Sequence, residues 1–280
     1  MILSFAPGAP GATAAALLLG LPSIVALTAY LAAALMGERF APALRATLLG
    51  AWLAHGLAIV VDTGGFGTAA VGARFGFAPA LSVTVWLVLA VYGIESRFVP
   101  LPGVRRTLAW LGVATVVLAW MFPGEFRPHA ASRWAPLHWV LGIASYGLFG
   151  AAVLHGAMLN RAEQQLRQRV ATPDPALPAG MPLLRLERLT FRFVGAGFAV
   201  LSLALLLGAW FASPWRWDHK TIFSMLGWLV FAALLAGRRA FGWRGPRATR
   251  WLYTGAGLLL LAYVGSRFVL EVLLQRPPAA

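Results

Sequence analysis

The sequence predicts an all-α fold: a polytopic transmembrane helical bundle of about eight helices, with both termini outside. Three observations carry this prediction. Of 280 residues, 60% are hydrophobic and only 11% are charged, and the mean hydropathy is +0.75, well above ordinary globular usage. The apolar runs lack the two-residue alternation of barrel strands. Most basic residues lie in short segments between these runs, as in membrane proteins.

About twenty apolar residues span a bilayer as a helix. Residues 1–11 contain no Lys or Arg, so the first run lacks the basic region of a signal peptide, and we expect it to stay as an anchor. After the fifth run, NRAEQQLRQR is expected to extend the helix, and the Pro-rich TPDPALPAGMP to form a linker. We expect one integral membrane domain over residues 1–280. The eight predicted segments are 12–36, 44–61, 78–95, 104–122, 136–159, 190–211, 221–237 and 250–273.

Charge orients these segments. The connections after the first, third, fifth and seventh runs hold sixteen Lys and Arg residues, whereas the other connections and the C-terminal tail hold six. Because basic loops stay in the cytoplasm, we expect a multi-pass protein of the bacterial inner (plasma) membrane. The formal net charge of +14 is explained by these loops, so no nucleic acid is expected as a partner.

Several kinds of chemistry are excluded by what the sequence lacks. Cysteine is absent, which rules out disulfides, thiolate metal sites and the CxxCH attachment motif of c-type cytochromes. The sequence has no Ser/His/Asp set, nucleotide-binding glycine loop or HExxH motif. We therefore do not expect an enzyme.

The segment WFASPWRWDHK at 210–220 has an unusual composition for a connection between two helices on the outer face. One interpretation is an aromatic belt, because tryptophan prefers the membrane interface. The other is a platform for a flat, apolar, anionic ligand such as a porphyrin, with indoles against the ring faces and cations against its carboxylates. The candidate residues for this platform are Trp215, Arg216, Trp217, Asp218, His219 and Lys220.

A haem also requires axial imidazoles. His138 begins the fifth run near the outer interface and is the best ligand candidate, while His219 lies in the Trp-rich segment. His55 lies within the second run, where a histidine is either a functional group or an interhelical hydrogen-bonding partner. His155, near the inner end of the fifth run, is expected to be structural.

These residues resemble a family. WRWDHK is similar to a shortened form of the tryptophan-rich WWD segment of the haem-handling cytochrome c assembly proteins of the CcsA/CcmC type. PLHWVLGIASYGLFG resembles the histidine-to-SY block that precedes that segment, and FGFAPALSVTVWL at 75–87 a further family block. WDHKT, GWRGPRA and YVGSRFVLE are similar to the small eight-helix YpjD/HemX-like branch.

The resemblance implies haem binding at the outer face. His138 matches the family histidine, and Trp215, Trp217 and Asp218 match the core of the WWD segment. The histidine that the family carries after this segment is replaced around residues 236–237, and the last helix has none. The resemblance therefore implies transient haem binding with His138 as the metal ligand, assisted by His55 or His219.

Two functions stay open from the sequence. The first is a haem-binding protein in cytochrome c assembly or haem delivery, whose partners are membrane lipid, haem and apocytochrome c or other cytochrome assembly proteins. The second is a non-catalytic regulator or scaffold of haem biosynthesis or cytochrome assembly, which acts through the arginines at 161–192 and 238–250. A small-molecule transporter is disfavoured because no two-half repeat is evident.

Overall fold

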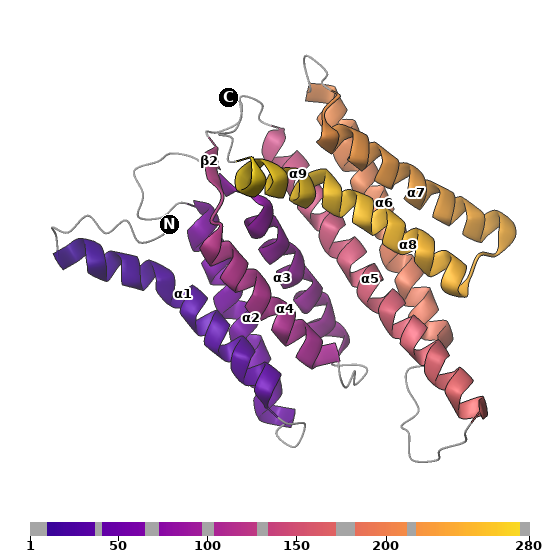
Figure 1. Cartoon of the computed structure of the whole chain (residues 1–280), viewed down its shortest axis with the longest axis horizontal. Coiled ribbons are helices and arrows are strands. Elements are labelled where there is room, and N and C mark those ends of the chain that lie inside the picture. Colours follow the sequence, from indigo (N-terminus) through magenta and orange to yellow (C-terminus); the bar gives the residue numbers. More distant parts are fainter. Residues whose placement is uncertain are drawn as a thin grey trace. The chain divides into compact units, whose positions relative to one another are not determined.

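The computed structural model describes residues 10–36, 41–64, 73–96, 104–127, 134–171, 183–211 and 217–274. These are almost entirely helical, which confirms the predicted all-α class (Figure 1). The eight principal helices are α1 (Pro10–Leu35), α2 (Ala41–Gly64), α3 (Phe77–Glu95), α4 (Val104–Met121), α5 (Ala135–Ala171), α6 (Leu183–Phe211), α7 (His219–Phe241) and α8 (Gly245–Leu260).

Eight principal helices are present, as predicted, whereas the bounds of the predicted membrane segments stay a prediction. Among the described residues, six helices, α2 to α7, are long and apolar enough to cross a membrane, and Gly20–Leu35 of α1 forms a shorter apolar stretch. Helix α5 continues to Ala171, which confirms the predicted extension, while α6 begins at Leu183 rather than residue 190. Its first turns carry arginines, so a hydropathy scan misses them although they are helical. The orientation, with both termini outside, stays a prediction.

Contacts divide the chain into two compact units, residues 1–131 with 267–280 (unit 1) and residues 132–266 (unit 2). The single integral membrane domain also stays a prediction. In unit 1, α1 packs on α2 and α4, and α3 packs on α2 and α4. Tyr30 of α1 is fully buried against Gly112 of α4, where an added Cβ would lie 2.9 Å from the tyrosine ring. A small residue here lets two helices approach closely, as is common in membranes.

Helices α2 and α3 are joined by a reciprocal tryptophan pair. Trp52 Nε1 donates to the Trp86 carbonyl at 3.1 Å, and Trp86 Nε1 donates to the Trp52 carbonyl at 2.9 Å. The two indoles are stacked, with centroids 4.8 Å apart and planes 5° apart. Each indole N–H therefore has a partner inside the bundle, and the pair fixes the register of the two helices.

Two short strands lie in unit 1 as well. Strand β1 (Ala73–Phe75) pairs antiparallel with β2 (Glu125–Arg127). Gly124 precedes β2 with φ of 76°, and an added Cβ would lie 2.6 Å from the Phe75 carbonyl oxygen, so this approach requires glycine. The sequence did not predict these strands, because three residues are too few for an alternating pattern.

Unit 2 contains α5 to α8, with α5 packed on α6 and α8, and α7 packed on α6 and α8. Its core centres on Phe149 and Phe231, whose rings stack 3.9 Å apart. Gly197 and Gly255 face these two rings, and an added Cβ would lie 3.0 Å from Phe149 or 2.8 Å from Phe231. The two rings therefore occupy the space that side chains at residues 197 and 255 would need.

The last predicted segment is helical but irregular. After α8 the chain forms a π-helical stretch, η2 (Leu261–Gly265), a short α9 (Ser266–Phe268) and a second π-helical stretch, η3 (Val269–Leu273). The Tyr146 hydroxyl of α5 donates to the carbonyl of Leu259, two residues before η2 begins. A side chain that engages the helix ladder in this way is a recognised cause of local irregularity. Hydropathy alone predicted a uniform helix here.

Candidate functional site at the start of helix α5

One end of unit 2, where α5 and α7 begin and α6 ends, holds most of the predicted haem-site residues. The described ones are His138, Trp217, Asp218, His219 and Lys220. Trp215 and Arg216 lie outside the described residues. His55 lies in unit 1.

The imidazole of His138 is held against α6 by a hydrogen bond to the backbone of that helix. Its Nδ1 lies 2.9 Å from the carbonyl oxygen of Ala204. A carbonyl only accepts hydrogen bonds, so Nδ1 carries the proton and Nε2 carries the lone pair. Metal-binding histidines are commonly fixed by such a bond from the other ring nitrogen. His138 is thus already in the tautomer that a metal ligand needs.

Gly208 creates the space for this imidazole. A Cβ added at Gly208 would lie 2.9 Å from His138 Cε1 and 3.2 Å from Nδ1, well inside normal contact distance. The histidine ring therefore lies where a side chain at residue 208 would be. Neither Gly208 nor Ala204 was predicted from the sequence, because the glycine within LLLGAW does not by itself reveal which side chain packs against it.

Asp218 has a structural role that the sequence analysis did not assign. It is the N-cap of α7, with extended backbone (φ −88°, ψ 166°), and its carboxylate accepts from the Thr221 N–H at 2.8 Å. N-capping by Asp satisfies an otherwise unpaired donor and favours the helix dipole. The Asp of the WRWDHK segment therefore fixes where α7 begins, and so where His219 and Lys220 are presented.

The other side chains form an exposed, cationic and aromatic margin. Lys220 Nζ lies 5.7 Å from the centroid of the Tyr263 ring on η2. Trp217 is 66% exposed and Trp210, in the last turn of α6, is 84% exposed. His219 is exposed as the first residue of α7. Tyr263 is a further member that the sequence analysis missed.

His55 is buried in unit 1, and side chains contact both of its ring nitrogens. It is 1% exposed, its Nδ1 lies 3.2 Å from the Tyr30 hydroxyl, and its Nε2 lies 2.7 Å from the Ser82 hydroxyl. Both ring nitrogens are therefore engaged by side chains of α1 and α3. To bind iron, His55 would have to give up one of these bonds.

The donor set suits a porphyrin better than a free metal ion. Within the described ranges, no group of three or more His, Cys, Asp or Glu side chains is arranged to hold a metal ion. The site instead combines one oriented imidazole, one cation and exposed indoles. A porphyrin carries its own four equatorial nitrogens, so one imidazole from the protein is enough to begin binding its iron.

Comparison with known proteins assigns the family. The family model described as "Cytochrome C assembly protein" matches residues 40–274, which include every described residue of this site. The chain belongs to this family. The predicted resemblance is confirmed at the family level, whereas the roles of individual residues stay predictions.

Family members differ in how much of this chain they match. Inner membrane protein YpjD of Escherichia coli K12 is 31% identical over 197 residues, which are 69% of this chain and 73% of YpjD. Cytochrome c biogenesis protein CcsA of Prochlorococcus marinus is 24% identical over 227 residues, 68% of this chain and 71% of the relative. CcsA of Synechococcus sp. JA-3-3Ab is 35% identical over 108 residues, 35% of this chain.

The last match spans 31% of the length of the Synechococcus protein, and two further cyanobacterial CcsA proteins are matched over about a third of theirs. No solved structure is significantly similar to the chain. The apolar helices and these relatives together identify a multi-pass protein of the bacterial inner membrane.

Proposed function

We propose that this protein binds haem transiently, as cargo, at the site around His138, and that it takes part in cytochrome c assembly or haem delivery without a catalytic step of its own. The observation that carries the proposal is the bond between His138 Nδ1 and the Ala204 carbonyl. It selects the tautomer with the lone pair on Nε2 and fixes the ring before any ligand arrives, which lowers the entropic cost of binding.

The surrounding side chains have complementary roles in this proposal. His138 would hold the haem iron through Nε2, and His219 would be the candidate for a second imidazole at the exposed margin. Lys220 meets a propionate carboxylate, as does Arg216, which lies outside the described residues. Trp217 and Trp215 pack on the porphyrin face, and Asp218 positions the segment through its N-cap. Haem itself supplies an iron that accepts axial imidazoles.

Relatives named cytochrome c biogenesis proteins support the assembly role. Apocytochrome c and other cytochrome assembly proteins are the partners that this role requires. His55 is a weaker candidate for a ligand, because both of its ring nitrogens are engaged within unit 1.

Haem titration of the purified full-length protein tests the proposal. We expect a Soret band that saturates with added haem and a haem affinity at least about tenfold weaker in His138→Ala, since loss of a metal ligand exceeds the 10-fold lower limit for loss of its supporting bond. His155→Asn is the control, because His155 lies on the same helix and its Nδ1 also contacts a backbone carbonyl, that of Ala151 at 2.8 Å. Absence of titratable haem, or equal affinity in His138→Ala, would overturn the proposal.

The scaffold function makes a different prediction. Exposed arginines lie at the other end of unit 2, on α6 and around the α7–α8 turn, and they would be its contact surface. Cytochrome c levels in cells carrying each variant separate the two functions. A haem carrier loses activity in His138→Ala, whereas a scaffold loses activity on substitution of the arginines and tolerates His138→Ala.

A further inference from the structure

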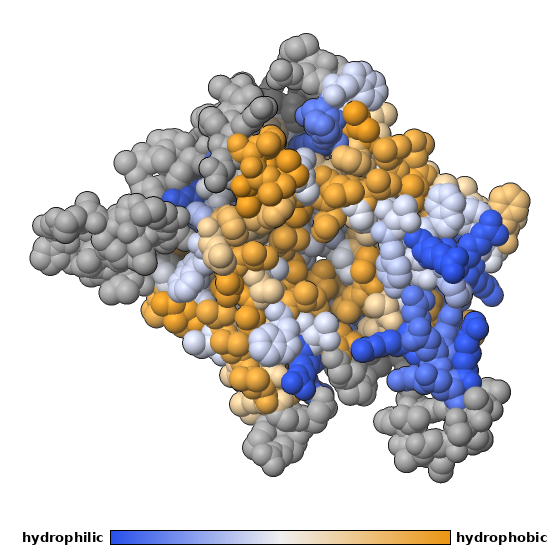
Figure 2. Space-filling view, viewed as in Figure 1, coloured by the Kyte–Doolittle hydropathy of each residue, from blue (hydrophilic) through white to orange (hydrophobic). Residues whose placement is uncertain are grey.

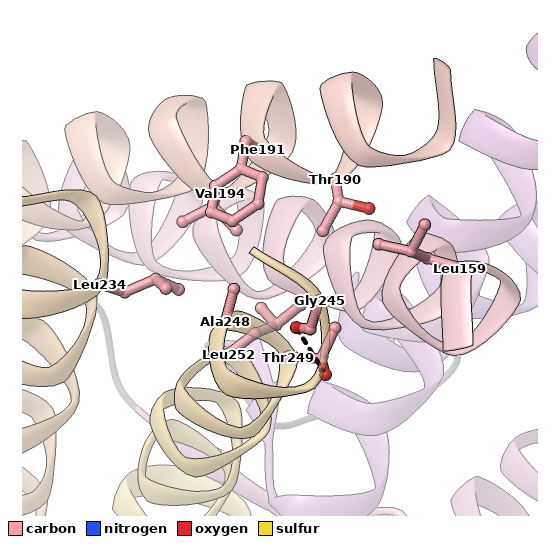
Figure 3. Close-up of a pocket in the computed structure, with 9 residues that line it drawn as sticks. All are labelled: Leu159, Thr190, Phe191, Val194, Leu234, Gly245, Ala248, Thr249 and Leu252. Atoms are coloured by element: carbon pink, nitrogen blue, oxygen red, sulfur yellow. Dashed lines mark hydrogen bonds between the residues drawn. The ribbon is translucent and has the colours of Figure 1, made fainter. Parts of the chain in front are cut away.

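The start of α7 forms a hydrophilic patch on the surface of unit 2. Figure 2 shows it at the top of the view, with apolar surface below it, and its exposed polar residues are Asp218, His219 and Lys220. The interior at the other end of unit 2 is closed by contrast: Figure 3 shows side chains of α5 to α8 that leave no room for a water molecule between them. A ligand of unit 2 is therefore expected at the patch rather than in that interior.

Lys220 lies where a cation is unfavourable. It is the second residue of α7, and the first turn of a helix carries a partial positive charge that favours anions and disfavours cations. The carboxylate of Asp218, the N-cap, offsets part of this cost. Helix stability therefore does not explain why a lysine occupies this position.

The surroundings of Lys220 keep a net positive charge. The segments of sequence at this end of unit 2 are 132–145, 204–223 and 259–266, and they contain three basic residues and one acidic residue. The acidic residue is Asp218, whose carboxylate already accepts a backbone N–H as the N-cap of α7. Lys220 is the basic residue among them that the structure describes. An anionic ligand is therefore attracted to this end.

Tyr263 holds the Lys220 side chain from the neighbouring helix. The ammonium nitrogen of Lys220 lies 5.7 Å from the centroid of the Tyr263 ring, within the distance of about 6 Å at which a cation is attracted to an aromatic face. Tyr263 is half-buried and lies in the middle of η2, which packs against α7. The tyrosine is therefore anchored more firmly than the exposed lysine, and its ring limits the positions that the ammonium can take.

The π-helical stretch that carries Tyr263 is supported by side chains. The Tyr146 hydroxyl of α5 donates to the Leu259 carbonyl. The Ser266 hydroxyl donates to the carbonyls of Ala262 at 2.8 Å and Tyr263 at 3.1 Å. π-Helical stretches are rare, and they occur frequently at functional sites. Here the central residue of such a stretch contacts the cation of the candidate haem site.

We propose that Tyr263 is a positioning residue of the haem site: its ring face holds the Lys220 ammonium where it binds a carboxylate, so that the site selects porphyrins with free carboxylates. This role rests on the haem binding proposed above and adds the ligand property that is selected. The preference comes from Lys220. Tyr263 acts through it, because restricting a flexible lysine lowers the entropic cost of binding.

Paired titrations with haem and haem dimethyl ester test this role. The ester carries the same iron and ring but no free carboxylate, so the ratio of the two affinities separates carboxylate recognition from iron binding. Soret titrations of the purified full-length protein in neutral detergent give both affinities. We expect haem to bind about fivefold more tightly, the upper value for an exposed ion pair. Tyr263→Leu and Lys220→Gln should each reduce this preference to about twofold or less.

Two further variants separate positioning from structural support. Tyr263→Phe keeps the aromatic face and should keep the fivefold preference. Tyr253→Leu is the matched control: it removes a half-buried tyrosine of α8, whose hydroxyl accepts from Asn160 at 3.1 Å, and should also keep the preference. If Tyr263→Leu weakens the binding of both porphyrins equally, Tyr263 only supports the fold and the positioning role is refuted.

The remaining outcomes also decide the matter. Lys220→Gln changes an exposed side chain and tests the same preference if Tyr263→Leu does not fold; a preference that survives it would overturn the proposal. Loss of the preference in Tyr263→Phe would overturn it as well, because the hydroxyl rather than the ring face would then be responsible. Equal affinity of the unsubstituted protein for haem and its ester would do the same while leaving haem binding at His138 intact. Absence of titratable haem would refute the proposed function, and the role of Tyr263 with it.

Discussion

Gly208→Ala tests whether the fixed position of His138 matters for haem binding. The new Cβ would lie 2.9 Å from His138 Cε1, whereas carbon atoms pack comfortably at about 3.5–4.0 Å. The ring must therefore retreat by about 0.6 Å or more. If the ring moved away from α6 by this distance, Nδ1 would shift from 2.9 Å to about 3.5 Å from the Ala204 oxygen, beyond the usual hydrogen-bond range.

The magnitude follows from this lost bond. Removal of the group that supports a metal-bound histidine typically weakens metal affinity 10- to 100-fold, so we expect haem affinity to fall by that factor. Stability should change little, because Ala is favoured over Gly within a helix by about 0.8–1 kcal/mol and this gain offsets the lost hydrogen bond of about 0.5–1.5 kcal/mol. The two measurements are a Soret titration and unfolding in mixed micelles.

Gly195→Ala is the control. Gly195 lies on the same helix, and an added Cβ there would meet no atom within 4 Å. This variant should gain helix stability and keep its haem affinity. If Gly208→Ala binds haem as tightly as Gly195→Ala, the position of the His138 ring is irrelevant to binding and the reasoning is refuted.

Three further predictions concern other contacts. Asp218→Ala should destabilise the protein by about 1 kcal/mol through loss of the N-cap, and Asp218→Asn should restore both stability and haem affinity; failure of Asn to restore affinity would assign the carboxylate a direct role. Trp52→Phe and Trp86→Phe should each cost about 0.5–1.5 kcal/mol of unfolding free energy for the lost indole bond, and their effects should be non-additive because the rings stack; strict additivity would contradict this. Tyr30→Phe should cost about 0.6 kcal/mol, the average for interhelical hydrogen bonds in membranes, without changing haem affinity; a fall in affinity would place His55 at the haem site.

The sequence predicted the elements whose signal is spread over many residues. Eight apolar runs predicted eight helices, and eight principal helices are present; among the described residues, six of them are long and apolar enough to cross a bilayer. The helical extension at 160–169 was predicted from its composition and is present in α5. Features that depend on single contacts were missed: the three-residue strands, and the π-helical stretch η2, which begins two residues after the Leu259 carbonyl that Tyr146 contacts. Such contacts join residues far apart along the chain, and no local pattern records them.

In the candidate site, too, unusual residue types could be read from the sequence, whereas single contacts could not. The sequence offered His138 and the Trp-rich segment as candidates because their residue types are unusual where they occur. It did not identify Gly208, since a glycine in a membrane helix is common and its neighbour depends on the packing of α5 against α6. The N-cap formed by Asp218 could have been predicted from the sequence, because an Asp directly before an apolar helical run is a known helix start signal. Asp218 was instead interpreted as part of the haem platform.

His55 and His138 show why burial alone does not identify a ligand. Burying an imidazole in a membrane helix costs free energy. Such a histidine is explained either by a function or by hydrogen bonds that offset this cost. Side chains from two helices engage both nitrogens of His55. Hydrogen bonds within unit 1 therefore offset the free-energy cost of its burial, and a metal would have to displace an existing partner. At His138 the bond to a backbone carbonyl places the proton on Nδ1 and the lone pair on Nε2. The bond that orients His138 is compatible with metal binding, and this difference makes His138 the better candidate for the iron ligand.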